Sequence, residues 1–345
     1  MLEKFTTLPI TPLIAEKPAQ PRDSSNLMVV MRSTGEIIHD KFFNIGKYLK
    51  KGDCITLNRS RVWKARLEAR KLTGAKTDFL LISPLEPERK KWKLLSRKAR
   101  IGDEYEVSGG AKARCIKINE DGSFSFEFSL PLSEAYLEKF ARVPLPVYIE
   151  KKRKEKGLDT NLKSDSSCYQ TVYARETGSI AAPTAGFHFT ENLIEDLSAS
   201  GVLFAHLILH VGWGTFRPVR TSPDKHKMLG EACEISEDSA QLINRVKRSG
   251  GRIAAVGTSC VRTLEKISSP DGVVKSGSDI SDIFIYPGYK FKVPDIFITN
   301  LHVPGSPPLF MTAAFCGEEL LFKAYSEAVS RKYRFYSYGD SMMII

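Results

Sequence analysis

The chain has 345 residues, of which 42% are hydrophobic, and its formal net charge is +11. This length suggests two domains, and no apolar run approaches the roughly 18 residues that a membrane-spanning helix needs. The first residues, MLEKFTTLPITPL, include an acid and no long apolar core, so they do not form a secretory signal. We therefore expect a cytoplasmic protein without a membrane partner. The 6 cysteines are scattered and form no CxxC pair, which indicates reduced thiols rather than disulfides or a zinc site.

The positive charge is concentrated in blocks. The main blocks are Arg89, Lys90, Lys91, Lys93, Arg97, Lys98 and Arg100, and then Lys151, Lys152, Arg153, Lys154 and Lys156. Such blocks fit the phosphate backbone of a nucleic acid, where binding is driven largely by counterion release. A solvated basic face without a partner would give the same pattern, so composition leaves both interpretations open.

The alternation of strands and helices predicts the fold class. We expect strands over 27–31, 54–57, 202–211, 252–256, 283–286 and 296–299, and helices from Ser236, from Gly257-Thr258-Ser259 and over 318–332. This order favours a mostly parallel sheet covered by helices. In the second of these helices, Thr258 or Ser259 is expected to be the N-cap.

Residues 61 to about 130 have a different pattern. Short predicted strands over 79–82, 92–95, 104–107, 113–118 and 124–128 alternate with glycine-containing turns. This spacing favours a small antiparallel barrel or sandwich. A helix over 133–140 follows, and a proline-containing linker over 142–148 leads back to the main body.

The stretch over 169–190, YQTVYARETGSIAAPTAGFHFT, has no regular period and is interpreted as a functional loop before a helix. Thr190 is the expected N-cap of that helix, and Gly201 suits its left-handed end. Such a loop offers backbone amides and a favourable helix dipole to a ligand. A merely irregular connection is the alternative.

Three further segments place polar residues near predicted strand ends. The segment LHVGWGTFR (209–217) is not a Rossmann fingerprint, because Arg217 occupies the position of the third glycine. His206 and His210 are more consistent with core or ligand contacts than with zinc binding. VGTSCVRTLE (256–265) is either an anion site at a helix start or a routine strand-to-helix turn. TNLHVPGSPP (299–308) is either a ligand-binding strand end or a closing polar loop.

Taken together, these segments resemble the S-adenosylmethionine:tRNA ribosyltransferase-isomerases of queuosine synthesis. The resemblance extends over most of the chain and includes VPLPVYI, YQTVYARETGSIAAPTAGFHFT, LHVGWGTFRPV, VGTSCVRTLE, DIFIYPGYKFKVPDIFITNLHVP and YRFYSYGDSMMII. It implies a three-layer α/β domain (1–60 plus 150–345) with an inserted small β-barrel domain (61–149).

The resemblance also implies an activity. The ribosyl group of S-adenosylmethionine would be transferred and isomerised onto 7-aminomethyl-7-deazaguanine at the tRNA wobble position, giving epoxyqueuosine and releasing adenine and methionine. S-adenosylmethionine would be a co-substrate, with no permanently bound cofactor or metal, and the basic blocks would face the tRNA backbone of a monomeric enzyme.

The site residues implied by the matched motifs fall into groups. His188, with Thr184, Gly186 and Phe187, would form part of the pocket, and His210, Gly212, Gly214 and Thr215 would line it. Thr258, Ser259 and Arg262 would take the methionine carboxylate, Asn300 and His302 would make polar contacts or transfer protons, and Tyr338 and Asp340 would close the site. The three histidines His188, His210 and His302 are the catalytic candidates.

The chain departs from the family pattern at a few positions. Arg59 stands where an acid is usual, Leu229 replaces a histidine, Gly305 replaces a lysine, and Trp213 replaces a smaller residue. A diverged paralogue that binds tRNA with weakened catalysis is therefore the alternative function. A generic S-adenosylmethionine methyltransferase is a third hypothesis, although its usual glycine-rich nucleotide loop is missing.

Overall fold

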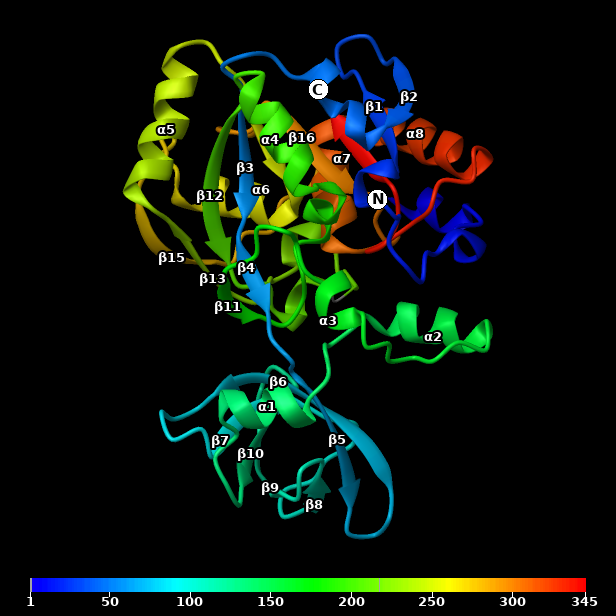
Figure 1. Cartoon of the computed structure of the whole chain (residues 1–345), viewed down its shortest axis with the longest axis vertical. Helices are drawn as coiled ribbons and strands as arrows, with labels where there is room; N and C mark the ends of the chain where they lie inside the picture. Colours follow the sequence, from blue (N-terminus) through cyan, green and yellow to red (C-terminus); the bar gives the residue numbers. More distant parts are fainter. Residues whose placement is uncertain (1, 217) are drawn as a thin grey trace. The chain divides into compact units, whose positions relative to one another are not determined.

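The computed structural model describes residues 2–216 and 218–345 (Figure 1). The chain forms two compact units. The sheet unit contains the chain up to Arg61, Val147–Thr160 and Gln170–Ile345, and the barrel unit contains Val62–Pro146 and Asn161–Tyr169. The domain boundaries predicted from the sequence, 1–60 with 150–345 and 61–149, stay a prediction.

The sheet unit is built on a nine-stranded sheet in the order β15-β13-β12-β3-β14-β16-β17-β1-β2. Its strands are β1 (Asn26–Val30), β2 (Ile37–Lys41), β3 (Cys54–Asn58), β12 (Leu203–Leu209), β13 (Glu231–Ile235), β14 (Ile253–Val256), β15 (Gly277–Ser281), β16 (Ile296–Asn300) and β17 (Ser341–Ile344). The central strands β12, β3, β14 and β16 are parallel, and β17 pairs parallel with β1. The pairs β16–β17, β1–β2, β12–β13 and β13–β15 are antiparallel. The prediction of a mostly parallel sheet therefore holds for the centre but not for the whole sheet, because antiparallel strands are added on both sides of the parallel centre.

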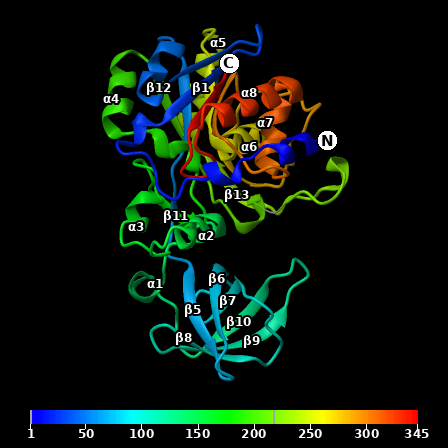
Figure 2. The ribbon, with the colours of Figure 1, turned by 90° about the vertical axis from the view of Figure 1, so that its right-hand side faces the viewer.

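Helices cover both faces of this sheet, as Figure 2 shows. They are α4 (Glu191–Ala199) on one face and α5 (Glu237–Arg248), α6 (Gly257–Ile267), α7 (Pro307–Cys316) and α8 (Glu318–Ser330) on the other. Because side chains alternate between the two faces of a strand, β1 contributes to both hydrophobic cores. Leu27 and Val29 pack with α4, whereas Met28 and Val30 belong to the core on the other face. This arrangement confirms the three-layer α/β architecture.

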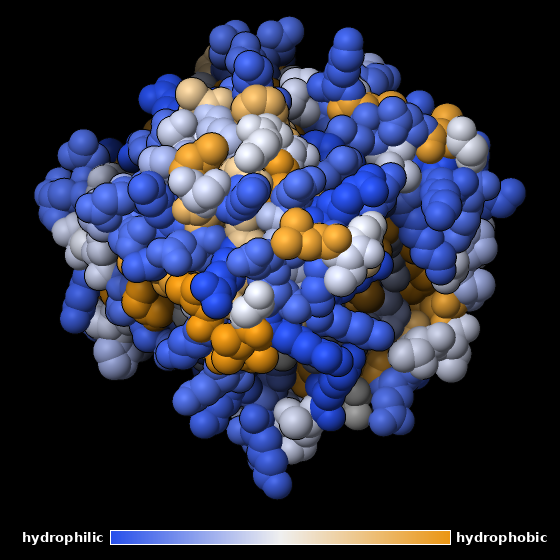
Figure 3. Space-filling view, turned by 90° about the horizontal axis from the view of Figure 1, so that it is seen from below, coloured by the Kyte–Doolittle hydropathy of each residue, from blue (hydrophilic) through white to orange (hydrophobic). Residues whose placement is uncertain are grey.

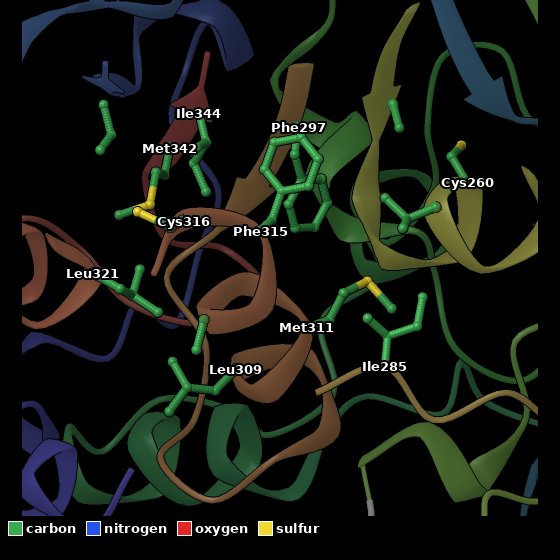
Figure 4. Close-up of a cluster of buried hydrophobic side chains, with 14 of the residues drawn as sticks. Cys260, Ile285, Phe297, Leu309, Met311, Phe315, Cys316, Leu321, Met342 and Ile344 are labelled. Carbon is green, nitrogen blue, oxygen red and sulfur yellow. The ribbon is translucent and has the colours of Figure 1, made fainter. Parts of the chain in front are cut away.

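The larger core lies beneath α6, α7 and α8. In Figure 4, Phe297 of β16 lies beside Phe315 of α7, and their ring centroids are 5.6 Å apart. Met342 and Ile344 of β17 belong to the same cluster. These contacts bind the C-terminal strand into the sheet, so the end of the chain is a core element.

Local sequence signals set several boundaries as predicted. Thr190 caps α4 by accepting from the Leu193 amide at 3.2 Å, and Gly201 follows the helix with a φ of +89°. Ser236 likewise caps α5. The predicted strand over 283–286 is wrong: this segment is irregular, and its apolar side chains pack on the core instead of pairing in the sheet. A helix also begins within the predicted linker over 142–148.

The barrel unit is a closed barrel in the order β10-β7-β6-β5-β8-β9. Its strands are β5 (Arg66–Lys71), β6 (Lys76–Pro84), β7 (Lys91–Leu95), β8 (Glu104–Val107), β9 (Lys112–Ile118) and β10 (Phe124–Phe128). Inward-facing Phe79, Tyr105 and Phe126 fill it, with Phe79 and Phe126 centroids 4.7 Å apart. The predicted barrel is therefore confirmed.

The remaining elements are short. They are α1 (Glu134–Phe140), α2 (Val147–Glu155), α3 (Asp165–Cys168), the pair β4 (Ser60–Val62) with β11 (Glu176–Ser179), and several 3-10 helices, of which the longest is Phe42–Tyr48. On the face shown in Figure 3, hydrophilic residues predominate and hydrophobic ones form small separate patches. No helix in the described ranges is both long and apolar enough to cross a bilayer.

Candidate active site

A pocket opens at the carboxyl ends of the central parallel strands, where β14 passes into α6 and where β16 ends. This edge is the usual ligand-binding edge of an open α/β sheet. The pocket is lined by Tyr148, Ala182, Pro183, Thr184, Ala185, Leu209, Val211, Gly257, Thr258, Ser259, Arg262, Thr299, Asn300, His302, Val303, Ser306, Pro308, Tyr336 and Ser337. All of these residues belong to the sheet unit.

The start of α6 forms one wall of the pocket. Gly257 has a φ of +83°, a left-handed conformation that lets the chain turn directly from β14 into the helix. Val256 occupies the N-cap position without a side-chain bond, so the predicted capping by Thr258 or Ser259 is wrong because both lie inside the first turn. Ser259 is 6% exposed, and its buried Oγ has no hydrogen-bond partner in the described structure. The helix start therefore combines unsatisfied amides with an unused hydroxyl.

Arg262 lies one turn further along α6 and is paired with an acid. Its Nη1 contacts a Glu231 carboxylate oxygen, and its Nη2 donates to the Ser281 carbonyl at 2.6 Å. The other Glu231 oxygen accepts from the Gly212 amide at 2.5 Å. The side chains of Arg262 and Glu231 are only 4% and 3% exposed. Much of the charge of Arg262 is thus already neutralised within the protein.

Asn300, at the end of β16, is fixed by several partners. Its Oδ1 accepts from the Thr184 hydroxyl at 3.2 Å, and its Nδ2 lies 3.3 Å from both the Tyr336 carbonyl and Nε2 of His188. Nδ1 of His188 in turn lies 2.7 Å from Oγ of Ser25. This network assigns a neutral tautomer in which Nε2 accepts from Asn300 and Nδ1–H donates to Ser25.

The structure places His188 behind Asn300 and not at the pocket wall. Its ring packs on Phe42, with centroids 5.0 Å apart, and the residue is 4% exposed. Burial lowers the pKa of His188 to about 4, and the charges of Arg334 and Arg22 add to this effect while Asp340 opposes it. His188 is therefore not a lining residue of this pocket, and its expected part in the site and in catalysis stays a prediction.

His302 does line the pocket. Its Nε2 lies 2.6 Å from Oγ1 of Thr299, and its backbone amide donates to the Tyr325 hydroxyl at 2.7 Å. Burial lowers the pKa of His302 to about 3, so the imidazole is neutral at physiological pH. Of the histidines in the described ranges, His302 is the one that reaches this wall.

The segment after β12 is only partly at the pocket. Leu209 and Val211 line it, but His210 points to the other side, where Nδ1 lies 2.9 Å from Oγ of Ser60, and burial lowers its pKa. The backbone amide of Gly212 donates to the Glu231 carboxylate and does not line the pocket. Gly214 lies against the side chain of Leu229, and the side chain of Thr215 is outside the described residues.

The remaining predicted residues support the pocket from outside. A Cβ added to Gly186 would lie 1.9 Å from the hydroxyl oxygen of Tyr173, so only glycine fits there. Phe187 and Tyr338 pack ring against ring, with centroids 5.8 Å apart. Asp340 is buried and accepts from Arg334 at 2.8 Å and from Asn26 at 2.9 Å, so it secures the C-terminal segment.

Sequence reasoning missed several residues of the wall. Tyr148 of α2 and Ser337 meet across it, with their hydroxyl oxygens 2.5 Å apart, and burial raises the pKa of Tyr148 to about 12. Ser306 and Tyr336 also line the pocket. The tail motif YRFYSYGD carried a signal for Tyr336 and Ser337, but nothing local indicates their proximity to Tyr148.

The departures from the family pattern are not themselves lining residues of this pocket, although Gly305 lies between the lining residues Val303 and Ser306. Arg59 follows β3 and has its Nη2 3.6 Å from Glu176. Leu229 packs against Gly214, and the Gly305 carbonyl accepts from the Val219 amide at 2.9 Å. None of these residues or Trp213 is among the described lining residues.

Comparisons with known proteins agree over nearly the whole chain. The profile of a family described as queuosine biosynthesis protein matches residues 4–344. The S-adenosylmethionine:tRNA ribosyltransferase-isomerases of Thermoanaerobacter sp. (strain X514) and Symbiobacterium thermophilum are 44% and 43% identical over 340 residues, which are 96% of this chain and 96% of each relative. The crystal structure of an S-adenosylmethionine tRNA ribosyltransferase from Thermotoga maritima is 34% identical, covers 98% of both chains and has a TM-score of 0.54.

Proposed function

Because this chain belongs to the queuosine biosynthesis protein family, we propose that it transfers and isomerises the ribosyl group of S-adenosylmethionine onto 7-aminomethyl-7-deazaguanine in tRNA. Epoxyqueuosine-tRNA would form, and adenine and methionine would leave. The observation that carries this proposal is the 44% identity to a named ribosyltransferase-isomerase over 96% of both chains. A catalytically weakened paralogue is not favoured, because the relatives that match over 96% of this chain are named as the ribosyltransferase-isomerase and Arg59, Leu229 and Gly305 are not themselves lining residues.

We assign the methionine carboxylate to the first turn of α6. Its amides, the helix dipole and the unpartnered hydroxyl of Ser259 all favour an anionic oxygen. Such a terminus contributes up to about 2 kcal/mol in a partly buried site. Arg262 is already paired with Glu231. We therefore expect the Ser259 hydroxyl and the backbone amides to contribute more to binding of the methionine carboxylate than the Arg262 guanidinium does.

We assign the proton transfer to His302. The positive sulfur of S-adenosylmethionine makes the hydrogens on the ribose C5′ acidic. A neutral imidazole has a lone pair available, and Nε2–H can donate to Thr299 while Nδ1 accepts the C5′ proton. The electron pair is first held on the carbon next to the sulfonium and is then released into the ribose as the bond from C1′ to adenine breaks, and adenine takes up the proton from His302. The amine of the tRNA base then forms its bond to the ribose, and methionine leaves as the C5′–S bond breaks.

The pocket has to widen for this ligand. Its interior is about 50 Å³, enough for a few water molecules but not for a nucleoside. We therefore expect the pocket to widen when S-adenosylmethionine binds. We further propose a cytoplasmic monomer without a permanently bound cofactor, with 1–60 plus 150–345 as the catalytic domain and 61–149 as an inserted domain.

The proposal is tested by incubating the protein with S-adenosylmethionine and an anticodon stem-loop that carries 7-aminomethyl-7-deazaguanine. We expect adenine, methionine and ribosylated RNA in equal amounts, and none of them with an unmodified stem-loop. RNA binding without adenine release would indicate the tRNA-binding paralogue instead. Methylated RNA together with S-adenosylhomocysteine would indicate a methyltransferase.

A further inference from the structure

The barrel unit contains a larger groove than the pocket described above. Its volume is about 550 Å³, and it lies along β5, β6 and β8. Arg70, Lys76 and Arg97 line it and are exposed. Across the described part of the chain, none of these cations forms an ion pair. The groove is therefore a surface with uncompensated positive charge.

The strand register makes this charge costly for the barrel. Arg70 of β5 is directly opposite Lys76 of β6. Like charges directly opposite each other destabilise a sheet, so this pair works against the stability of the barrel. Glu106, opposite Arg70 on its other side, offsets part of this cost, and a ligand of negative charge would offset the rest.

Two of the three acids that line the groove are paired with Arg142, which also lines it. Glu68 and Asp78 lie 3.2 and 3.3 Å from the Arg142 guanidinium. Asp78 is also 3.9 Å from Arg66. Glu106, opposite Arg70 on β8, is the remaining acid of the groove. The balance at the groove thus stays positive.

Two buried polar atoms in the groove have no hydrogen-bond partner in the described structure. They are Oγ1 of Thr77, which can donate or accept, and Nε of Arg142, which can only donate. Buried polar groups are usually satisfied, so each of these atoms indicates a missing partner. The oxygens of a phosphate group would offer acceptors to both atoms and would also neutralise the neighbouring cations.

We propose that this groove binds a sugar–phosphate segment of the tRNA substrate, away from the base that is modified. The proposal rests on the proposed function, which supplies the RNA. The groove would hold the RNA and would not take part in the ribosyl transfer. Loss of the groove should therefore weaken tRNA binding and leave the chemistry at the pocket of the sheet unit intact.

The test compares two triple variants of the full chain. The groove variant is Arg70→Ala, Lys76→Ala and Arg97→Ala. The matched control is Arg114→Ala, Lys117→Ala and Lys139→Ala, which removes three exposed cations of the same barrel unit that do not line the groove. Both variants lose the same net charge, so a general electrostatic effect would change them equally. Circular dichroism and thermal melting confirm that both are folded.

Dissociation constants for unmodified tRNA are measured at several salt concentrations by fluorescence anisotropy. We expect the groove variant to bind at least about tenfold more weakly, with its salt slope reduced by about 2, since each lost phosphate contact removes roughly 0.7–0.9. The control should stay within about threefold of the wild type. Glu106→Gln, which removes the remaining acid, should tighten binding. Equal losses in the two triple variants, or no loss in the groove variant, would overturn the proposal.

Turnover separates this inference from the proposed function. With saturating modified tRNA, the groove variant should release adenine at the wild-type kcat but with a raised KM for tRNA. If the wild type releases adenine and the groove variant has an unchanged KM, the groove is not the RNA site although the function stands. If the wild type binds tRNA through the groove but releases no adenine, the function is wrong and the groove inference survives.

Discussion

The side-chain amide of Asn300 lies 3.3 Å from Nε2 of His188, which is buried behind it. Asn300 is at the pocket wall, so the histidine fixes the direction in which the amide presents its atoms to a ligand. His188 is thus a positioning residue in this account, and its partner Ser25 holds the tautomer that makes this possible.

This relationship predicts different effects for two substitutions of His188. His188→Gln can still accept from Asn300 through its amide oxygen, whereas His188→Leu leaves a buried donor without that partner. Such a loss costs about 1–3 kcal/mol, so we expect kcat/KM for S-adenosylmethionine to fall about tenfold to hundredfold in the leucine variant and much less in the glutamine variant. Equal losses in both variants would mean that His188 itself carries a proton in the reaction.

The depressed pKa of His188 predicts a pH-dependent stability. Its folded pKa is about 4, below the unfolded value of about 6.5, so the unfolded chain binds more protons between these values. The free energy of unfolding should therefore fall as the pH falls from 7 towards 4, by about 2–3 kcal/mol from this group. Urea unfolding at pH 7 and 4.5 measures this decrease, and the decrease should be smaller in the His188→Gln variant by the contribution of His188. Identical decreases in the wild type and the variant would contradict the assigned role of the His188 pKa.

The unpartnered hydroxyl of Ser259 predicts a loss of binding without a loss of stability. Ser259→Ala removes no hydrogen bond within the protein, so the melting temperature should change little, while the dissociation constant for S-adenosylmethionine should rise about tenfold. Thr263→Val is the matched control, because the Thr263 hydroxyl donates to the Ser259 carbonyl in the same helix. That variant should lose stability and keep its affinity. Calorimetric titration and melting curves distinguish the two patterns.

The pairing of Arg262 with Glu231 predicts a strong effect on stability. Glu231→Ala leaves a guanidinium that is buried without its acid and also frees the Gly212 amide. Breaking a buried pair in this way costs about 3–5 kcal/mol. Urea unfolding should show this loss, and the double variant Glu231→Ala with Arg262→Met should recover part of it. A loss of less than about 1 kcal/mol would indicate that water reaches the site.

Local signals predicted the elements of the fold better than its long-range contacts. The caps at Thr190 and Ser236 and the barrel strands follow from short patterns, because capping and strand alternation depend on neighbouring residues. The strand predicted over 283–286 is wrong, because an irregular segment whose side chains pack on a core has the same apolar pattern as a strand.

The candidate site was only partly predictable for the same reason. His302 and Asn300 were found because they end a strand, and Ser259 because it starts a helix. The contact between His188 and Ser25 joins residues 163 positions apart, so no local pattern indicates that His188 is directed away from the pocket. The like-charge pair of Arg70 and Lys76 also depends on strand register, which the sequence alone did not provide.

The central claim is that the ribose, and not the methyl group, of S-adenosylmethionine reaches the RNA. It is tested most directly with S-adenosylmethionine labelled with ¹⁴C in the ribose and with ³H in the methyl group, mixed with the modified stem-loop. We predict that the purified RNA contains ¹⁴C without ³H, and that the ³H is recovered in methionine. RNA that contains ³H, or RNA that contains neither label after prolonged incubation, would contradict the account.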